Sequence, residues 1–273
     1  LSHIVQAFGG PGRTVLGFTP SYSMHPLITT GTGATWQASA RNDDFTLDAE
    51  TVAAEVAALN PDIVFLCTPN NPTGTSIDLD VIEAAYDNCS GIVIVDEAYA
   101  EFSRPARASA MTLLDGRPRL VVSRTMSKAF ACAGLRLGYA IASPDLIDVL
   151  RLVRLPYHLS EITQVLASTA LEHADLLLEN VDRLIDSRDR ISQHLDAAGF
   201  TVYPSDSNFV LFGSIASPHD LWQKLLDRGI LIRDIGIDHH ARVNAGTDEE
   251  TTAFLTAVDE ILAEDPAIVL SAN

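Results

Sequence analysis

The stretch DIVFLCTPNNPTG, residues 62–74, joins a nearly unbroken apolar run to a cluster of Asn, Pro and Gly. An apolar run without alternation predicts a strand that is buried on both faces, as in a parallel sheet. The Asn-Pro and Gly residues that follow favour a turn. The pattern of a short apolar run recurs along the first half of the chain, and we expect strands at residues 14–18, 62–67, 91–96, 120–123 and 137–142.

Helical patterns lie between several of these strands, at residues 47–59 and 79–88. Strands and helices that take turns predict a mostly parallel sheet covered by helices on both faces. The expected fold class is therefore α/β, with three layers in the order αβα. Residues 1–8 have the apolar spacing of a helix face without an initiator Met before them, so we expect a preceding segment in the natural protein.

The pattern changes after Pro156. A long helical pattern runs over residues 160–198, and it is followed by shorter units that indicate an α+β region. In that region we expect strands at 208–212, 230–234 and 241–246 and helices at 219–229 and 248–265. The sequence predicts three parts, namely a large domain over 1–158, a connecting helical region over 159–198, and a small C-terminal domain over 199–273.

Composition excludes several classes of protein. The chain has 273 residues with 36 acidic and 18 basic side chains, a net charge of −18, which would repel a nucleic-acid backbone. Its cysteines, Cys67, Cys89 and Cys132, form no CxxC pair, which argues against a disulfide framework or a metal site. No apolar run approaches the roughly 20 residues that span a bilayer. We expect a cytoplasmic protein that binds neither nucleic acid nor membrane.

Polar clusters follow three of the expected strands. Asn71 lies in TPNNPTG, Asp96 and Tyr99 lie in VDEAY, and Lys128 lies in SRTMSKAF. Each has an ordinary structural explanation by itself: a turn, a helix cap or a surface lysine. The carboxyl ends of parallel strands meet at one edge of a sheet, where ligands bind. Three such clusters in succession therefore favour a functional site.

The three motifs, in this order and spacing, resemble the fold type I pyridoxal-phosphate aminotransferases over essentially the whole chain. Further stretches are most similar to the histidinol-phosphate aminotransferase branch: PSYSMH (20–25), RLPYHLS (154–160), SNFVLF (207–212), ILIRD (230–234) and ARVNAGTDEE (241–250). The resemblance implies transfer of an amino group between histidinol phosphate and 2-oxoglutarate, giving imidazole acetol phosphate and glutamate, in histidine biosynthesis. It also implies a homodimer with sites at the subunit boundary.

The resemblance assigns roles around pyridoxal 5′-phosphate. Lys128 would bond to the cofactor aldehyde and move a proton as general base and acid. Asp96 would pair with the protonated pyridine nitrogen. Tyr99 and Asn71 would donate hydrogen bonds to the ring oxygen, and Tyr22 would stack on the ring.

The remaining assignments concern anions. Thr125, Ser127 and Arg136 would bind the cofactor phosphate. In the C-terminal region the resemblance implies three substrate contacts: Arg242 for the α-carboxylate, Arg233 for a second anion, and Asn208 near the carboxylate. A surface ion pair is the alternative for Arg233. The family also has a phosphate-binding glycine loop upstream of the first helix, which is not part of this sequence.

Three alternatives stay open. An aromatic, phenylalanine-type aminotransferase is the nearest rival within the family. A decarboxylase of a phosphorylated amino acid would use the same cofactor motifs. A catalytically silent relative could bind a partner through the same fold, although such a protein has no chemical need for the set of Lys128, Asp96, Tyr99, Asn71 and Arg136.

Overall fold

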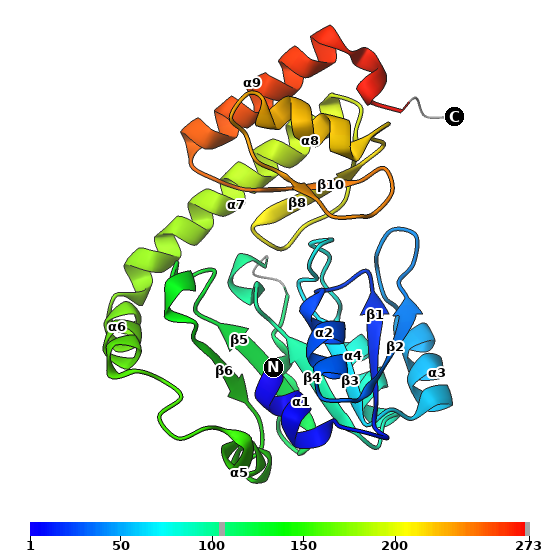
Figure 1. The fold of residues 1–273 in the computed structure, drawn as a ribbon, viewed down its shortest axis with the longest axis vertical. Helices are drawn as coiled ribbons and strands as arrows, with labels where there is room; N and C mark the ends of the chain where they lie inside the picture. Colours follow the sequence, from blue (N-terminus) through cyan, green and yellow to red (C-terminus); the bar gives the residue numbers. More distant parts are fainter. Residues whose placement is uncertain (104–106, 271–273) are drawn as a thin grey trace.

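The computed structural model of the protein describes residues 1–103 and 107–270. Two β-sheets organise these residues, one of six strands and one of four (Figure 1). The strands of the larger sheet are β1 (Thr14–Thr19), β2 (Thr35–Ala40), β3 (Ile63–Cys67), β4 (Ile92–Asp96), β5 (Leu120–Thr125) and β6 (Gly138–Ile141). The strands of the smaller sheet are β7 (Thr201–Val202), β8 (Phe209–Gly213), β9 (Arg233–Asp234) and β10 (Ala241–Asn244).

Helices cover both sheets. The α-helices are α1 (Ser2–Phe8), α2 (Met24–Gly31), α3 (Ala49–Leu59), α4 (Leu79–Asp87), α5 (Pro144–Val153), α6 (Glu161–Glu172), α7 (Ala174–Ala197), α8 (Pro218–Leu226) and α9 (Asp248–Glu264). Short 3-10 helices follow β4 at Ala100–Phe102 and precede β5 at Ala110–Leu113. None of the helices within the described residues is long and apolar enough to cross a membrane.

The larger sheet is the middle of three layers. Successive side chains of a strand point to opposite faces. On β3, Val64 and Leu66 belong to a core that α3 and α4 complete, whereas Ile63 and Phe65 belong to a second core that includes residues of α1 and α5. β3 is therefore buried on both faces, as its apolar run predicts. The α/β class with three layers is confirmed.

The strand order creates a position for a site. The order is β2-β1-β3-β4-β5-β6, with the first five strands parallel and β6 antiparallel to β5. The chain leaves β1 toward β2 on one side, and β3 lies on the other side. This reversal is a topological switch point, and ligands of open α/β sheets bind outside the carboxyl ends of strands at such a point.

The smaller sheet and its helices form a second unit with a separate core. The strand order is β7-β8-β10-β9, and all neighbouring strands are antiparallel. Residues of α8, α9 and the end of α7 complete this core. Below, "large-sheet unit" means the six-stranded sheet with α1–α5, and "small-sheet unit" means the four-stranded sheet with α8 and α9.

Helix α7 joins the two units along one side of the molecule (Figure 1). Its Arg188 is fully buried and donates hydrogen bonds to the carbonyl oxygens of Phe102 and Ser207, both at 3.2 Å. Phe102 follows β4 of the large sheet, and Ser207 precedes β8 of the small sheet. One guanidinium therefore links both units to the connecting helix.

The structure confirms most of the expected elements and corrects four points. The final strand of the large sheet, expected to be buried on both faces, is an exposed antiparallel edge, because only β5 flanks it. The helical region 160–198 is two helices with a break at His173. Of the expected strand 230–234, only Arg233–Asp234 pairs with a neighbour. Sequence reasoning missed β2, β7 and α2, whose apolar patterns are short or mixed, and it also missed α5, whose pattern is amphipathic.

Candidate active site

Residues from both sheets meet at the carboxyl edge of the large sheet. The loops and strand ends after β1, β3, β4 and β5 carry Tyr22, Asn71, Asp96 and Lys128. From the small sheet, Arg242 on β10 reaches this edge, and its Nη1 donates to Asn71 Oδ1 at 2.5 Å. Two residues 171 positions apart are thus in direct contact, and the candidate site lies between the two units.

Asp96 is the last residue of β4 and is buried. It accepts a hydrogen bond from Ser123 Oγ at 3.2 Å, and His25 Nε2 lies 3.3 Å from its other oxygen. The His25 ring stacks on Phe65, with centroids 4.3 Å apart. No lysine or arginine among residues 1–103 and 107–270 forms an ion pair with Asp96. Its carboxylate therefore stays available for a cationic group from outside the chain.

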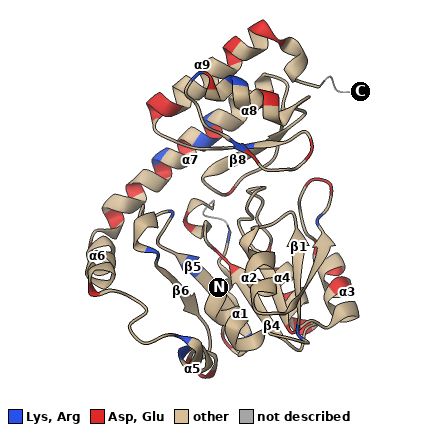
Figure 2. Ribbon diagram, in the orientation of Figure 1, with Lys and Arg blue, Asp and Glu red and all other residues tan. Residues whose placement is uncertain are grey.

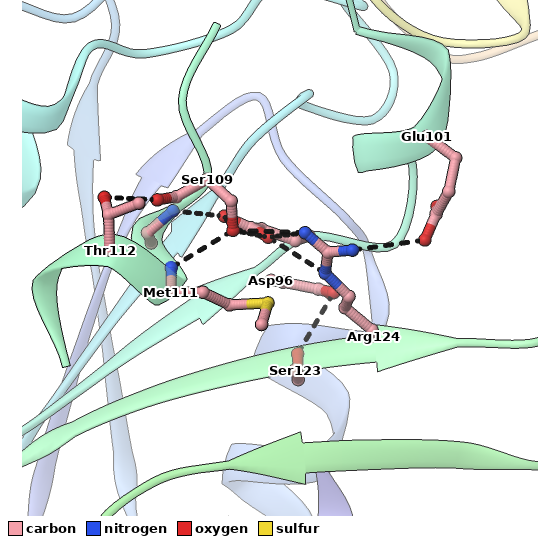
Figure 3. Close-up of polar contacts among 9 residues, drawn as sticks. Asp96, Glu101, Ser109, Met111, Thr112, Ser123 and Arg124 are labelled. Carbon is pink, nitrogen blue, oxygen red and sulfur yellow. Dashed lines mark hydrogen bonds and ion pairs between the residues drawn. The ribbon is translucent and has the colours of Figure 1, made fainter.

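Glu97, the next residue, belongs to a different network, whose other members include Arg124, Ser109 and Glu101, labelled in Figure 3. Arg124 donates to it through Nη2 at 2.7 Å and Nε at 3.1 Å, and the backbone N–H of Ala110 donates at 2.7 Å. Ser109 also donates to Glu97, and Glu101 accepts from Arg124 at 3.4 Å. Burial raises the pKa of Glu101. This buried network joins the ends of β4 and β5, and so holds the two strand ends in register.

Lys128 lies next to Tyr99. Its Nζ is 5.3 Å from the centroid of the Tyr99 ring. Burial of part of the side chain, and then the positive charges of Arg242 and Arg136, lower the pKa of Lys128. Burial also raises the pKa of Tyr99, which keeps its hydroxyl protonated as a donor. The arrangement favours a neutral, nucleophilic amine beside a phenol.

The connection between β5 and β6 carries two hydroxyls and a guanidinium. Thr125 pairs with Gly138 in the β5–β6 ladder, Ser127 follows Thr125 by two residues, and Arg136 precedes Gly138 by two residues. Thr125 Oγ1 lies 3.0 Å from Ser127 Oγ, and it accepts the Ser127 N–H at 3.1 Å. Arg136 is exposed and donates to the carbonyl of Ala133 at 3.0 Å. Such a group of donors suits a phosphate.

A second pair of cations faces the site from the small sheet. Arg242 and Arg233 are direct partners in the β10–β9 ladder. The Arg242 guanidinium lies 4.6 Å from the centroid of the Phe209 ring, and burial lowers the pKa of Arg242. Asn208 Oδ1 and Arg242 Nε are both buried without a partner among the described residues. Unpaired polar atoms of this kind indicate that a polar ligand completes the site.

The set of residues fits pyridoxal 5′-phosphate. The buried carboxylate of Asp96, which pairs with no lysine or arginine among the described residues, suits a protonated ring nitrogen, and the Lys128 amine suits an aldehyde. The hydroxyls of Thr125 and Ser127 with the guanidinium of Arg136 suit the phosphate. Tyr22 lies edge-to-face against His25, with centroids 5.5 Å apart, and burial and then Asp96 raise its pKa.

Not every residue singled out in the sequence lies in this group. Arg233 is exposed at its rim. His158, in RLPYHLS, is exposed and contacts His3 with centroids 6.0 Å apart. Sequence reasoning missed the roles of His25 and of the Glu97–Arg124 pair, although all three lie inside quoted motifs. Their position next to Tyr22, Asp96 and Lys128 is the only signal that the sequence carries for them.

Comparisons with known proteins show the family of the chain. The family model for class I and II aminotransferases matches residues 1–258. The histidinol-phosphate aminotransferase of Paenarthrobacter aurescens is 55% identical over 265 residues, which cover 96% of this chain and 71% of that protein. The enzyme of the same name from Streptomyces avermitilis is 52% identical over 271 residues, 98% of this chain and 73% of that protein.

A solved structure has the same fold. Histidinol-phosphate aminotransferase from Sinorhizobium meliloti, in complex with pyridoxal-5′-phosphate, superimposes with a TM-score of 0.86 at 25% sequence identity. The match covers 96% of this chain and 74% of that chain.

Proposed function

Because the chain belongs to the class I and II aminotransferase family, we propose that it is a pyridoxal-phosphate-dependent aminotransferase for histidinol phosphate and 2-oxoglutarate. One structural observation carries the reaction class. A lysine of lowered pKa, Lys128, lies at the same sheet edge as Asp96, a buried carboxylate that pairs with no lysine or arginine of the described residues, and the charge of Arg242 contributes to the lowering. The choice of substrate rests on the 52–55% identity to histidinol-phosphate aminotransferases.

The cofactor supplies an aldehyde that accepts the amino group and a ring that withdraws electrons from the substrate α-carbon. Asp96 would hold the proton of the pyridine nitrogen, and Ser123 and His25 orient its carboxylate. Lys128 would take the proton from the α-carbon and return it to the cofactor carbon. The lowered pKa of Lys128 increases the fraction of neutral amine that can act as a base.

Six other residues would hold the ring and its phosphate in place. Tyr99 and Asn71 would donate hydrogen bonds to the ring oxygen, and Tyr22 would cover the ring face. Thr125 and Ser127, with Arg136 from the same hairpin, would bind the phosphate with directed and charge-assisted hydrogen bonds.

Two different substrates use the site in turn. Glutamate carries an α-carboxylate, which Arg242 would bind through its guanidinium, with Asn208 beside it. Histidinol phosphate has no carboxylate, so Arg242 would serve mainly the glutamate half-reaction. Arg233, at the exposed rim, would contact the second anion, either the substrate phosphate or the glutamate side chain.

We propose that the protein acts as a homodimer. Exposed apolar side chains gather on α5, α6 and the segment between them, and Tyr157 is 99% exposed. Leu152, Leu155, Ile162 and Val165 belong to the same group. A surface of this kind on a water-soluble enzyme marks an interface. Light scattering should give twice the mass of one chain, and Ile162→Asp should shift the protein toward monomer.

The division into a large domain (1–158), a connecting region (159–198) and a small domain (199–273) also remains a proposal. Two separate cores with α7 between them support it. Residues 271–273 lie outside the described part of the chain. A cytoplasmic location is proposed as well, since the cysteines of the described residues are free thiols.

A substrate comparison tests the proposed function. The purified holoenzyme is assayed with histidinol phosphate, phenylalanine and tyrosine as amino donors and 2-oxoglutarate as acceptor, and kcat/KM is compared. We expect the highest kcat/KM for histidinol phosphate. A clear preference for phenylalanine would identify an aromatic aminotransferase instead, and release of CO₂ from a phosphorylated amino acid added as a further substrate, without glutamate formation, would identify a decarboxylase.

A further inference from the structure

Phe45 lies in the loop after β2, in a backbone conformation that side chains rarely adopt. Its φ is 63°, in the left-handed region. Such a conformation persists where the surroundings hold it. Here Arg41 Nη1 and Thr75 Oγ1 both donate to the Phe45 carbonyl, at 3.2 and 3.1 Å, and the Phe45 N–H donates to the carbonyl of Asn42 at 2.8 Å. The loop is therefore fixed to the large-sheet unit.

Arg41 is buried, and its guanidinium also donates a hydrogen bond to the end of β1. Its Nε donates to the carbonyl of Phe18 at 3.3 Å. Burial lowers the pKa of Arg41 to about 10. Across residues 1–103 and 107–270, no carboxylate forms an ion pair with it. Burying a cation costs free energy unless it is hydrogen-bonded, and here the two backbone carbonyls supply those hydrogen bonds. Arg41 therefore fixes the position of the Phe45 loop against β1.

The Phe45 ring docks on two rings of the small-sheet unit. Its centroid lies 4.8 Å from that of Tyr203 and 5.6 Å from that of His240, and both contacts are edge-to-face. His240 Nδ1 donates to the carbonyl of Asp238 at 2.6 Å, and its Nε2 forms a hydrogen bond with the Tyr203 hydroxyl at 3.0 Å. Gly213 leaves the space for this ring, since a Cβ there would lie 2.8 Å from His240 Nε2.

The contact of Phe45 with the two rings lies close to Arg242, the proposed carboxylate-binding residue, on both sides of the site. On the small-sheet side, His240 lies two residues before Arg242. On the large-sheet side, Thr75 holds Phe45 and belongs to the same loop as Asn71, which accepts from Arg242. The two contacts therefore join the same pair of segments across the site.

We propose that Phe45 is a positioning residue for Arg242: its ring fixes the segment that leads into β10, and so fixes the guanidinium where a substrate carboxylate binds. The proposal deepens the proposed function and rests on it for the role of Arg242. Phe45 does not touch the substrate or the cofactor in this scheme. Its loss should weaken the binding of carboxylates without changing the binding of the cofactor.

Phe45→Gly is the test variant, because glycine tolerates the positive φ while the ring is lost. Phe45→Asn, which also tolerates this conformation, is the second variant if the first fails to fold. The holoenzyme is titrated calorimetrically with succinate, a dicarboxylate that is not an amine. We expect succinate to bind about tenfold more weakly to Phe45→Gly, with the cofactor absorbance unchanged.

A double-mutant cycle separates positioning from a general loss of structure. In an Arg242→Ala background, Phe45→Gly should weaken succinate binding no further, because its target is gone. Tyr203→Phe keeps the ring contact and should bind like the wild type, whereas Tyr203→Ala should match Phe45→Gly.

Additive effects of Phe45→Gly and Arg242→Ala would overturn the proposal, and so would a wild type that does not bind succinate. The titration needs no turnover, so it tests Phe45 whatever amino donor the wild type prefers. Failure of the proposed function would appear separately, in the substrate comparison.

Discussion

The two sides of the site are built differently. On the large-sheet side, the buried carboxylates of Asp96 and Glu97 each accept hydrogen bonds from side chains of the sheet, Asp96 from Ser123 at 3.2 Å and Glu97 from Arg124 at 2.7 Å. On the small-sheet side, Arg242 makes one side-chain hydrogen bond within the described residues, to Asn71, and its neighbour Arg233 is exposed. A carboxylate held by several groups suits a cofactor that stays bound, whereas Arg242, whose Nε is buried without a partner among the described residues, keeps a donor for an anion that arrives with the substrate.

Charge shows the same contrast on a larger scale. Acidic residues are spread over α3, α7 and α9, on the outside of the molecule (Figure 2). The site instead collects cations, among them Lys128, Arg136 and Arg242. For a chain of net charge −18, this concentration of positive charge draws phosphate and carboxylate groups to one place.

The largest expected effect uses the only two lysines of the chain, one in each unit. Lys128→Ala should lower kcat by at least about 10³-fold, because the amine that moves the proton is lost. Lys224 on α8 pairs with Asp265 at 2.8 Å, far from the chemistry, and Lys224→Ala should keep full activity. A multiple-turnover assay and the visible absorbance of the bound cofactor measure both. Normal turnover by Lys128→Ala would refute its role.

Arg124→Ala tests the structural role of the Glu97–Arg124 pair on the large-sheet side. The substitution leaves the buried carboxylate of Glu97 without its cation, and we expect the free energy of unfolding to fall by about 3–5 kcal/mol. The double variant Arg124→Met/Glu97→Gln should recover part of that loss, since no unpaired charge remains. Denaturant unfolding checks both. Equal stability of Arg124→Ala and the wild type would mean that the network is not needed to hold the strand ends.

Asp96→Asn addresses the carboxylate next to Glu97, for which we expect the opposite behaviour. The variant should fold and bind the cofactor, but kcat should fall by about 10²–10³-fold, because a neutral amide does not hold the ring nitrogen protonated. Asp87→Asn, on the exposed end of α4, is the control. Steady-state kinetics and cofactor titration are the measurements, and a wild-type kcat would contradict the role of Asp96.

Arg242→Ala tests the small-sheet side. A lost charge-assisted contact to the carboxylate should cost about 2 kcal/mol or more, so KM for glutamate should rise by roughly 30-fold or more. KM for histidinol phosphate, which has no carboxylate, should change much less. The two half-reactions are followed separately by the cofactor absorbance. Equal damage to both would show that Arg242 does not select the carboxylate.

The smallest effect concerns the pKa of Lys128. Burial and the positive charges of Arg242 and Arg136 disfavour its ammonium form, so its pKa is lowered and the neutral amine exists at lower pH than in a free lysine. Labelling of the cofactor-free protein with an amine-reactive reagent, followed by mass spectrometry across pH, measures this. Arg242→Ala removes one positive charge, so the profile should move to higher pH. An unmoved profile would mean that the two units are electrostatically independent.

The sequence by itself determined the three-layer fold and which residues lie at the large-sheet side of the candidate site. Short apolar runs such as residues 62–67, bounded by turn residues, favour strands buried on both faces, so most of the inner strands followed from local pattern. Asn71, Asp96 and Lys128 were predicted to lie near one another because each follows such a run within a few residues, and parallel strands bring their carboxyl ends together.

Only the tertiary structure decided what those residues touch. Asp96 contacts His25, whereas the adjacent Glu97 contacts Arg124. Successive side chains at a strand end point to different faces, and the partners on each face come from other segments of the chain. The sequence around Asp96 and Glu97 therefore does not predict these partners. Phe45, Tyr203 and His240 carry no motif, and their contact depends on how two separately packed cores are set against each other. Such long-range packing depends on the shapes of both units together. No single stretch of sequence predicts it.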